Sequence, residues 1–301
     1  MEYLAASLVI VSLFIYAVLF SIECGATIFI AVPGLLGGDE AVHRYINPAW
    51  ETTNVFLVTA LISLIAFFPG AVPVWGVALI VPFFFFLLVM GVRVIGMLYV
   101  FYKEGENRAM KWLLAAASVA APAVLAGGLL PFFVAGTMPY GAGAWLLAAG
   151  FALFTLASTI FISSSFFRPM ERFARAALMF FLTAAMFLIA TLFRAAPHLA
   201  TGVASALPAL AALAILDLAL FFTAWGRRQR MRFFSAVALF AAFFFAVMFS
   251  QLPYVIYPSV TIFSAFTDPA SAQIILGAFG IAAIFLVPAL GLLYYLFAFK
   301  K

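Results

Sequence analysis

The sequence predicts an all-α polytopic integral membrane protein with about nine transmembrane helices. Of its 301 residues, 68% are hydrophobic and only 8% are charged, and the mean hydropathy is +1.25. A soluble domain needs about 25% charged residues to cover its surface, so the composition excludes a soluble globular fold. The long Ala, Leu and Phe tracts show no apolar/polar alternation at period two, which argues against a strand barrel.

Nine apolar runs, separated by charged or turn-forming clusters, carry this prediction. A helix needs about 20 apolar residues to cross the hydrocarbon core of a bilayer, and each run is about that long or longer. We expect the whole chain, residues 1–301, to form a single transmembrane helical domain. The predicted spans are residues 4–36, 52–70, 73–101, 112–135, 144–166, 176–194, 206–225, 233–253 and 273–299.

The cations predict the orientation of these spans. In the nine-span arrangement, 13 of the 15 Lys and Arg residues fall on one side of the membrane, which we expect to be cytoplasmic, with the N-terminus outside and the C-terminus inside. The net charge of +5 is thereby explained by topology, without a nucleic-acid partner. The basic cluster Arg227–Arg232 would suit anionic lipid head groups, but topology is the simpler explanation. The 13 cations are Arg44, Lys103, Arg108, Lys111, Arg168, Arg172, Arg175, Arg227, Arg228, Arg230, Arg232, Lys300 and Lys301.

The chain is poor in residues that hold metals or haem. Its two histidines, His43 and His198, lie in predicted loops on opposite sides of the membrane. Two-histidine haem ligation needs imidazoles that face each other within a bundle, and copper or di-iron centres need more ligands still. We therefore expect no cofactor and no metal bound by this chain alone, and no complete active site within it.

Four ionisable residues lie at or near membrane depth. Glu23, Arg93 and Asp217 fall within predicted spans, and Glu51 begins the second span. An unpaired charge that faces lipid costs about 3 kcal/mol or more, so such residues need a partner or a function. In the predicted topology Glu23, Glu51 and Arg93 converge on the cytoplasmic half of the membrane.

Two interpretations of these residues are open. A row of carboxyls that opens to the cytoplasm would admit protons, because burial disfavours the charged form of a carboxyl whereas a nearby arginine favours it. Alternatively, Arg93 neutralises a carboxylate and locks helices together, and Glu51 only favours the positive N-terminus of its helix. Asp217 has no obvious partner in the sequence, and it fits either a protonated, hydrogen-bonded group or a member of a proton relay.

The stretch Ile46–Val58 resembles the segment that enters the second helix in subunit II of the cytochrome bd quinol oxidases, where the pattern is Pro-x-Trp-Asp-Gly-Asn-x-Val-Trp-Leu. The resemblance continues through Ala66–Pro69, through Arg93 and the aromatic stretch after it, and through the outer loop Leu252–Ile262. The chain length, the number of spans and the short basic C-terminal tail also agree with this family. The resemblance therefore covers most of the chain.

Two motifs depart from the family pattern. The family usually has Asp-Gly-Phe-Asp near the end of its first helix, whereas Ser21–Ala26 contains a single acid, Glu23. The family's Trp-Asp-Gly-Asn is replaced by Trp50–Thr53, which keeps an acid in Glu51 but loses the glycine. Both changes preserve a carboxylate and alter its surroundings, so they bear on the proton path and on the electron acceptor.

The resemblance implies a heterodimer in the prokaryotic cytoplasmic membrane. Subunit I holds haem b and haem d and oxidises quinol, oxygen is reduced to water, and protons are drawn from the cytoplasm. Subunit II carries no haem in that family, and here it would stabilise subunit I and conduct protons through Glu51, Glu23 and Asp217, with Arg93 as their charge partner. A quinone or lipid bound within the chain is left open.

Two other functions are compatible with the residues. A secondary transporter would also place acids within the membrane, although it predicts internal repeats and interrupted helices that the sequence does not display. A bd-like subunit coupled to a different electron donor or acceptor would account for the altered first-helix motif. Co-purification with a haem-bearing subunit favours an oxidase over a transporter.

Overall fold

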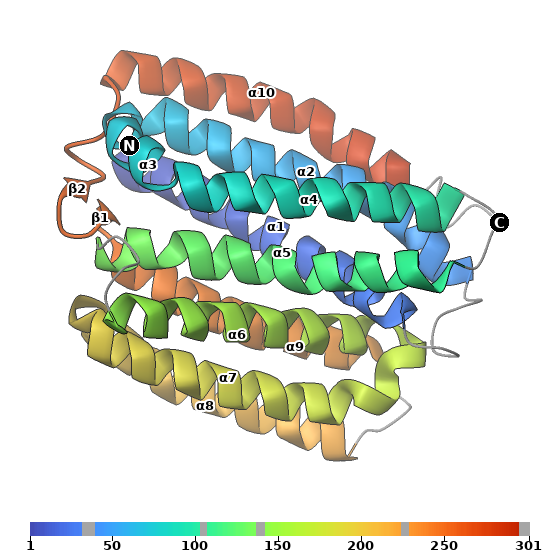
Figure 1. Cartoon of the computed structure of the whole chain (residues 1–301). Coiled ribbons are helices and arrows are strands. Elements are labelled where there is room, and N and C mark those ends of the chain that lie inside the picture. The colour runs from blue at the N-terminus through green and yellow to red at the C-terminus, as the bar shows by residue number, and fades with distance from the viewer. Residues whose placement is uncertain (32–39, 103–106, 137–141, 224–228, 295–301) are drawn as a thin grey trace.

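The computed structural model describes residues 1–31, 40–102, 107–136, 142–223 and 229–294. Its long helices lie side by side in one bundle, with the connections at the two ends (Figure 1). The elements are α1 (Glu2–Ile30), α2 (Glu40–Phe67), η1 (Pro69–Ala71), α3 (Val72–Ala78), α4 (Ile80–Tyr102), α5 (Arg108–Ala135), α6 (Ala142–Phe166), η2 (Arg168–Phe173), α7 (Ala174–Ala195), α8 (Pro197–Thr223), α9 (Gln229–Gln251), β1 (Tyr254–Ile256), β2 (Val260–Thr261) and α10 (Pro269–Tyr294).

The number of membrane-crossing helices agrees with the predicted fold class. Within the described ranges, eight helices are long and apolar enough to cross a membrane, and there are up to nine if one bent pair counts as a single span. The bent pair consists of Thr52–Phe67 and Pro69–Ala78, which meet at 91°. The prediction of an all-α polytopic membrane protein is confirmed.

Several predicted boundaries are wrong. The helix α2 begins at Glu40 and not near residue 52, so Glu51 lies within that helix and not at its N-terminus, and His43, predicted to lie in a loop, is in its first turn.

The span predicted over residues 73–101 is divided into α3 and α4, which are separated at Leu79. Pro82 lacks the backbone donor that a continuing helix would direct to the carbonyl of Ala78, four residues earlier, which accounts for the break at this point. His198, predicted to lie in a loop, is in the first turn of α8, because that helix begins at Pro197, where proline is well tolerated.

The helices α1 and α6 form the centre of the bundle and pack against each other. In addition, α1 packs against α2, α5 and α9, and α6 packs against α5, α7 and α9. By contrast, α8 packs on α7 and α9, and α10 packs on α2, so these two helices lie at opposite edges (Figure 1). Polar groups on α1 therefore lie further from the outer surface of the bundle than polar groups on the edge helices.

Gly25 lets α1 and α6 approach closely. A Cβ atom at this position would lie 2.0 Å from Ser163 Oγ and 2.9 Å from the Thr159 carbonyl oxygen. Small residues permit such close approach of membrane helices. On α6 the Ser163 hydroxyl donates back to the Thr159 carbonyl at 2.6 Å, so this polar side chain is satisfied within its own helix.

The β1–β2 hairpin covers one end of the bundle. The helix α5 stops at Gly136, whose φ of 62° lies in the left-handed region that favours glycine. A Cβ atom there would lie 1.8 Å from the Tyr257 carbonyl oxygen. The Tyr257 amide in turn donates to the Phe133 carbonyl at 3.1 Å, which ties the hairpin to α5.

Candidate functional site

A buried ion pair joins α1 to α4. The Arg93 Nη2 atom donates to Glu23 Oε1 at 2.6 Å, and both side chains are 0% exposed. Arg93 lies nine residues before the end of α4, or about 13 Å along the helix axis. The ring of Phe20, one turn before Glu23, covers the guanidinium with its centroid 5.5 Å from Arg93 Cζ. The fold therefore holds a full pair of charges inside an apolar bundle.

Two hydroxyl side chains extend this pair to a third helix. Arg93 Nε donates to Ser118 Oγ on α5 at 3.2 Å, and the Thr27 hydroxyl on α1 donates to the same oxygen at 2.7 Å. Both hydroxyl residues are fully buried. Sequence reasoning missed them, although Thr27 lies one helical turn after Glu23, and that spacing places the two on one face. The cluster is a small polar centre shared by α1, α4 and α5.

Three buried polar atoms of this centre make no hydrogen bond to the described residues. Glu23 Oε2, Arg93 Nη1 and the Tyr16 hydroxyl are buried, and none has a hydrogen-bond partner among the described residues. Buried polar atoms in native proteins are nearly always paired with protein groups or with ordered water. The three atoms can therefore bind water molecules or another polar group, and a carboxylate with one oxygen available can exchange a proton with such a group.

The other two predicted acids are placed differently. Asp217 on α8 is 1% exposed and accepts a hydrogen bond from the Ser235 hydroxyl on α9. Since α8 packs on α7 and α9, the structure does not bring Asp217 to the pair on α1 and α4. Glu51 lies in α2, directly before the buried Thr52 and Thr53, and its side chain is outside what the structure describes.

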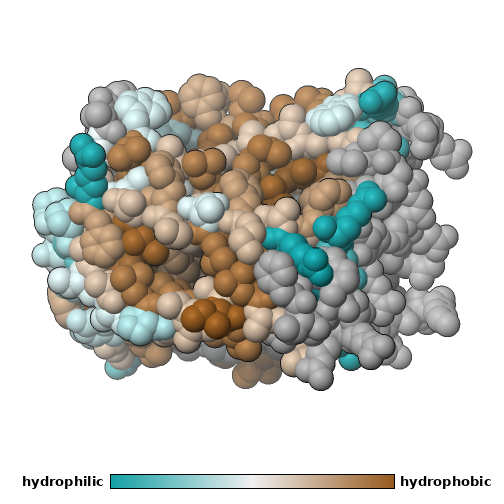
Figure 2. All heavy atoms as spheres, turned by 90° about the horizontal axis from the view of Figure 1, so that it is seen from below, coloured by the Kyte–Doolittle hydropathy of each residue, from teal (hydrophilic) through white to brown (hydrophobic). Residues whose placement is uncertain are grey.

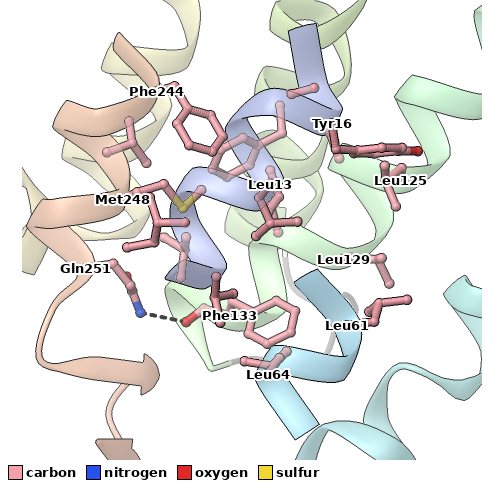
Figure 3. Close-up of a pocket in the computed structure, with 18 of the residues that line it drawn as sticks. Leu13, Tyr16, Leu61, Leu64, Leu125, Leu129, Phe133, Phe244, Met248 and Gln251 are labelled. Carbon is pink, nitrogen blue, oxygen red and sulfur yellow. Dashed lines mark hydrogen bonds between the residues drawn. The ribbon is translucent and has the colours of Figure 1, made fainter. Parts of the chain in front are cut away.

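An apolar cavity of about 550 Å³ lies beside the polar centre. Most of its wall comes from α1, α2, α4, α5 and α9, with further residues from α3, α6, α7 and the β1–β2 hairpin, and it includes Leu13, Leu64 and Met248 (Figure 3). Near one end is Tyr16, and near the other is Gln251, whose Nε2 donates to the Phe133 carbonyl at 2.9 Å. A cavity of this size and lining suits an apolar chain.

The histidines do not form a metal centre in the part of the chain that is described. His198 Nε2 lies 3.3 Å from Gln251 Oε1, and the His198 ring stacks on Tyr257 with centroids 3.6 Å apart. The side chain of His43 lies outside the described residues. Across the described ranges, no three His, Cys, Asp or Glu side chains come together as metal ligands would.

Comparisons with known proteins agree with this architecture. A family model for cytochrome bd terminal oxidase subunit II matches residues 1–297. A relative from Bacillus subtilis (strain 168), named "Putative cytochrome bd menaquinol oxidase subunit II", is 27% identical over 321 residues, which cover 95% of this chain and 92% of the relative. A chain in the structure of bd oxidase from Geobacillus thermodenitrificans matches with a TM-score of 0.82 at 25% identity, over 100% of this chain and 99% of that one. The polytopic helical chain therefore belongs to the cytochrome bd terminal oxidase subunit II family.

Proposed function

We propose that this chain is the haem-free subunit of a quinol-oxidising, oxygen-reducing complex in the prokaryotic cytoplasmic membrane. It stabilises a haem-bearing subunit I, which holds haem b and haem d, and it conducts protons from the cytoplasm. Family membership supports the complex, and the name of the Bacillus relative supports menaquinol as its electron donor. Reduction of oxygen to water consumes protons, so a chain that lacks its own redox group can still contribute a route for them.

One observation carries the proton path: the buried Glu23–Arg93 pair leaves a carboxylate oxygen without a partner among the described residues. A proton that enters on the cytoplasmic side would reach Glu51 on α2 and pass by way of water to Glu23. Arg93 is the charge partner of that carboxyl, with Nη2 2.6 Å from Glu23 Oε1. Asp217 lies on the other side of α9 from the pair, so it would hold a proton on a separate branch.

A structural lock is the second candidate role for the same pair. The 2.6 Å contact and the complete burial of both side chains favour it, because such a pair ties α1 to α4 strongly when both partners are present. Lock and relay differ in what the carboxyl does during turnover. A relay must change protonation state in each cycle, whereas a lock must stay ionised.

The test is the variant pair Glu51→Gln and Glu23→Gln in the purified complex, with Glu2→Gln at the exposed end of α1 as the matched control. For a relay, we expect oxygen consumption per haem to fall about tenfold or more, since proton transfer by a positioned group contributes typically 10²–10⁴-fold. The haem spectra should be unchanged. If turnover per haem is normal and only the yield or thermal stability of the complex falls, the role of Glu23 is structural, as one partner of the ion pair that joins α1 to α4.

The apolar cavity supports a further part of this proposal, a bound lipid or quinone. Its walls are almost entirely apolar, with Tyr16, Trp75 and Gln251 among the few polar contributors. Extraction of the purified complex with organic solvent, followed by mass spectrometry, should recover such a molecule in a fixed ratio to the chain. Replacing Leu64 by Trp should fill the cavity and lower that ratio, and an unchanged ratio would place the molecule elsewhere.

The exposed faces of α4 and α10 support a docking surface for subunit I. Beyond the buried Ala272, none of the described side chains of α10 is buried, although they include large ones such as Phe285. Gly91 on α4 and Gly277 and Gly280 on α10 have nothing within 4 Å of an added Cβ, and exposed glycines allow a helix of another chain to approach closely. Gly277→Leu should weaken co-purification of subunit I, whereas Gly143→Leu on α6, whose added Cβ would also meet nothing within 4 Å, should not.

A further inference from the structure

A cationic edge forms where the start of α9 meets η2. Arg232 Nη2 donates to Glu171 Oε1 at 2.5 Å, and Gln229 Nε2 donates to the carbonyl of Phe166 at the end of α6, also at 2.5 Å. These two contacts hold the first turn of α9 against the segment that connects α6 to α7. Two segments far apart in the sequence, η2 and the start of α9, therefore lie next to each other.

The ion pair leaves this edge positively charged. Arg232 is 2% exposed and already occupies the carboxylate of Glu171. Arg172 follows Glu171 directly, and Arg230 lies two residues before Arg232, so both exposed arginines lie within two residues of this ion pair. Arg172 Cζ lies 5.0 Å from the centroid of the Phe173 ring, a cation–π distance that restrains its guanidinium.

Exposed apolar side chains continue from this edge along the helices. Met231 and Phe234 on α9 are 47% and 68% exposed, and Met179 on α7 is 41% exposed. The view from the α7/α8 side shows a broad hydrophobic surface, with hydrophilic side chains gathered towards its two ends (Figure 2). A ligand that fits this arrangement has an anionic head and apolar chains below it.

We propose that Arg172 and Arg230 form a binding site for the phosphate group of an anionic diacyl phospholipid, phosphatidylglycerol. A topology signal requires only cations near span ends, counted over whole loops. Here, exposed cations on two elements, η2 and α9, lie next in the chain to an ion pair that joins those elements and already occupies the nearby acid, as in the basic pockets between helices that bind anionic head groups. Arginine suits this role because its planar group can donate two hydrogen bonds to one phosphate.

The experiment uses the purified complex of this chain with subunit I, reconstituted with spin-labelled phosphatidylglycerol or phosphatidylcholine. Electron spin resonance measures the fraction of each label that the protein immobilises. We expect phosphatidylglycerol to be preferred and the preference to fall about fivefold for each arginine replaced in Arg172→Gln and Arg230→Gln, since one arginine near the surface contributes about 1 kcal/mol. The matched control is Arg194→Gln, which removes an exposed arginine at the opposite end of α7.

Three outcomes would overturn the proposal. The first is an unchanged preference in the double glutamine variant, and the second is an equal loss in the Arg194→Gln control, which would indicate a general charge effect. The third is displacement of the label by inorganic phosphate at an ionic strength at which chloride has no effect, which would indicate a site for free phosphate. If the double variant does not assemble, as judged by its haem spectrum, R230Q alone must lower the preference.

Discussion

Two Arg–Glu pairs in this chain have nearly the same geometry and lie in different surroundings. Glu23–Arg93 is 2.6 Å long and has both side chains at 0% exposure. Glu171–Arg232 is 2.5 Å long; its arginine is 2% exposed, but its glutamate is 22% exposed at the edge of the bundle. The depth of the carboxylate in the fold, more than the distance between the atoms, therefore distinguishes the two pairs.

The difference in depth changes what each pair can do. When one partner of a buried pair is removed, the other charge is left without compensation, which costs about 3–5 kcal/mol. At the edge of the bundle water reaches the carboxylate and screens it, so such a pair contributes about 1 kcal/mol or less. The central pair is therefore suited to hold helices or to exchange a proton, and the edge pair to position its neighbouring arginines.

Removing one central charge should have the largest effect. Arg93→Leu leaves the Glu23 carboxylate buried in an apolar bundle, and we expect the free energy of unfolding to fall by about 3–5 kcal/mol. Denaturation of the detergent-solubilised complex, followed by the loss of helical circular dichroism, measures it. The double variant E23Q/R93L should recover part of the loss. A drop below about 1 kcal/mol for Arg93→Leu would mean that water enters the site and that the two pairs are alike.

Separating the helices that shield the central pair should have an intermediate effect. Gly25→Ala forces a Cβ atom towards Ser163, and overpacking of this kind costs about 1–3 kcal/mol. The same denaturation measurement applies. The control is Gly143→Ala, where the added Cβ meets nothing within 4 Å. Equal stability of the two variants would show that α1 and α6 can move apart without loss.

Removing the arginine of the edge pair should have a smaller effect. Arg232→Gln leaves Glu171 in contact with water, and we expect a loss of about 1 kcal/mol or less in the free energy of unfolding. High salt should reduce the difference between this variant and the parent chain, because screening weakens a pair near the surface. A loss as large as that of Arg93→Leu would contradict the distinction by depth.

The smallest effect should come from a carboxylate fully in water. Hydrogen bonds from the side chain and the backbone amide of Ser271 hold the pKa of Asp268 below its usual value at the start of α10. A carboxyl with a lowered folded-state pKa stabilises the folded state above its unfolded pKa, and that contribution disappears as the pH falls through the folded pKa. Asp268→Ala should therefore speed hydrogen exchange of the Ser271 amide at neutral pH and have little effect at low pH.

The helices themselves were predictable, because lipid imposes a simple rule. Every apolar run long enough to cross a bilayer must form a helix that satisfies its own backbone. The rule is less informative where proline interrupts a run, and the predicted span over residues 73–101 failed there. It also says nothing about polar residues that follow an apolar run, which is why the first turn of α8, with His198, was predicted as a loop.

The candidate site was predictable in its residues and not in its contacts. Glu23, Arg93 and Asp217 stand out in the sequence because ionised side chains are rare at membrane depth. Nothing in their spacing distinguishes Asp217, which contacts Ser235 on α9, from Glu23, which contacts Arg93. Ser118 and Thr27 were missed because hydroxyl residues are common in membrane helices and commonly bond to their own backbone.

The sequence by itself determined that this chain is a helical membrane protein, which ionisable residues its spans contain, and the family that it resembles. These properties follow from composition and local order along the chain. Only the tertiary structure decided which helices are neighbours, that Glu23 and Arg93 meet while Asp217 lies apart, and that η2 and the start of α9 meet at the Glu171–Arg232 pair. The reason is physical: lipid is as apolar as the helix faces, so hydrophobicity places helices in the membrane, whereas close packing and polar contacts select their partners.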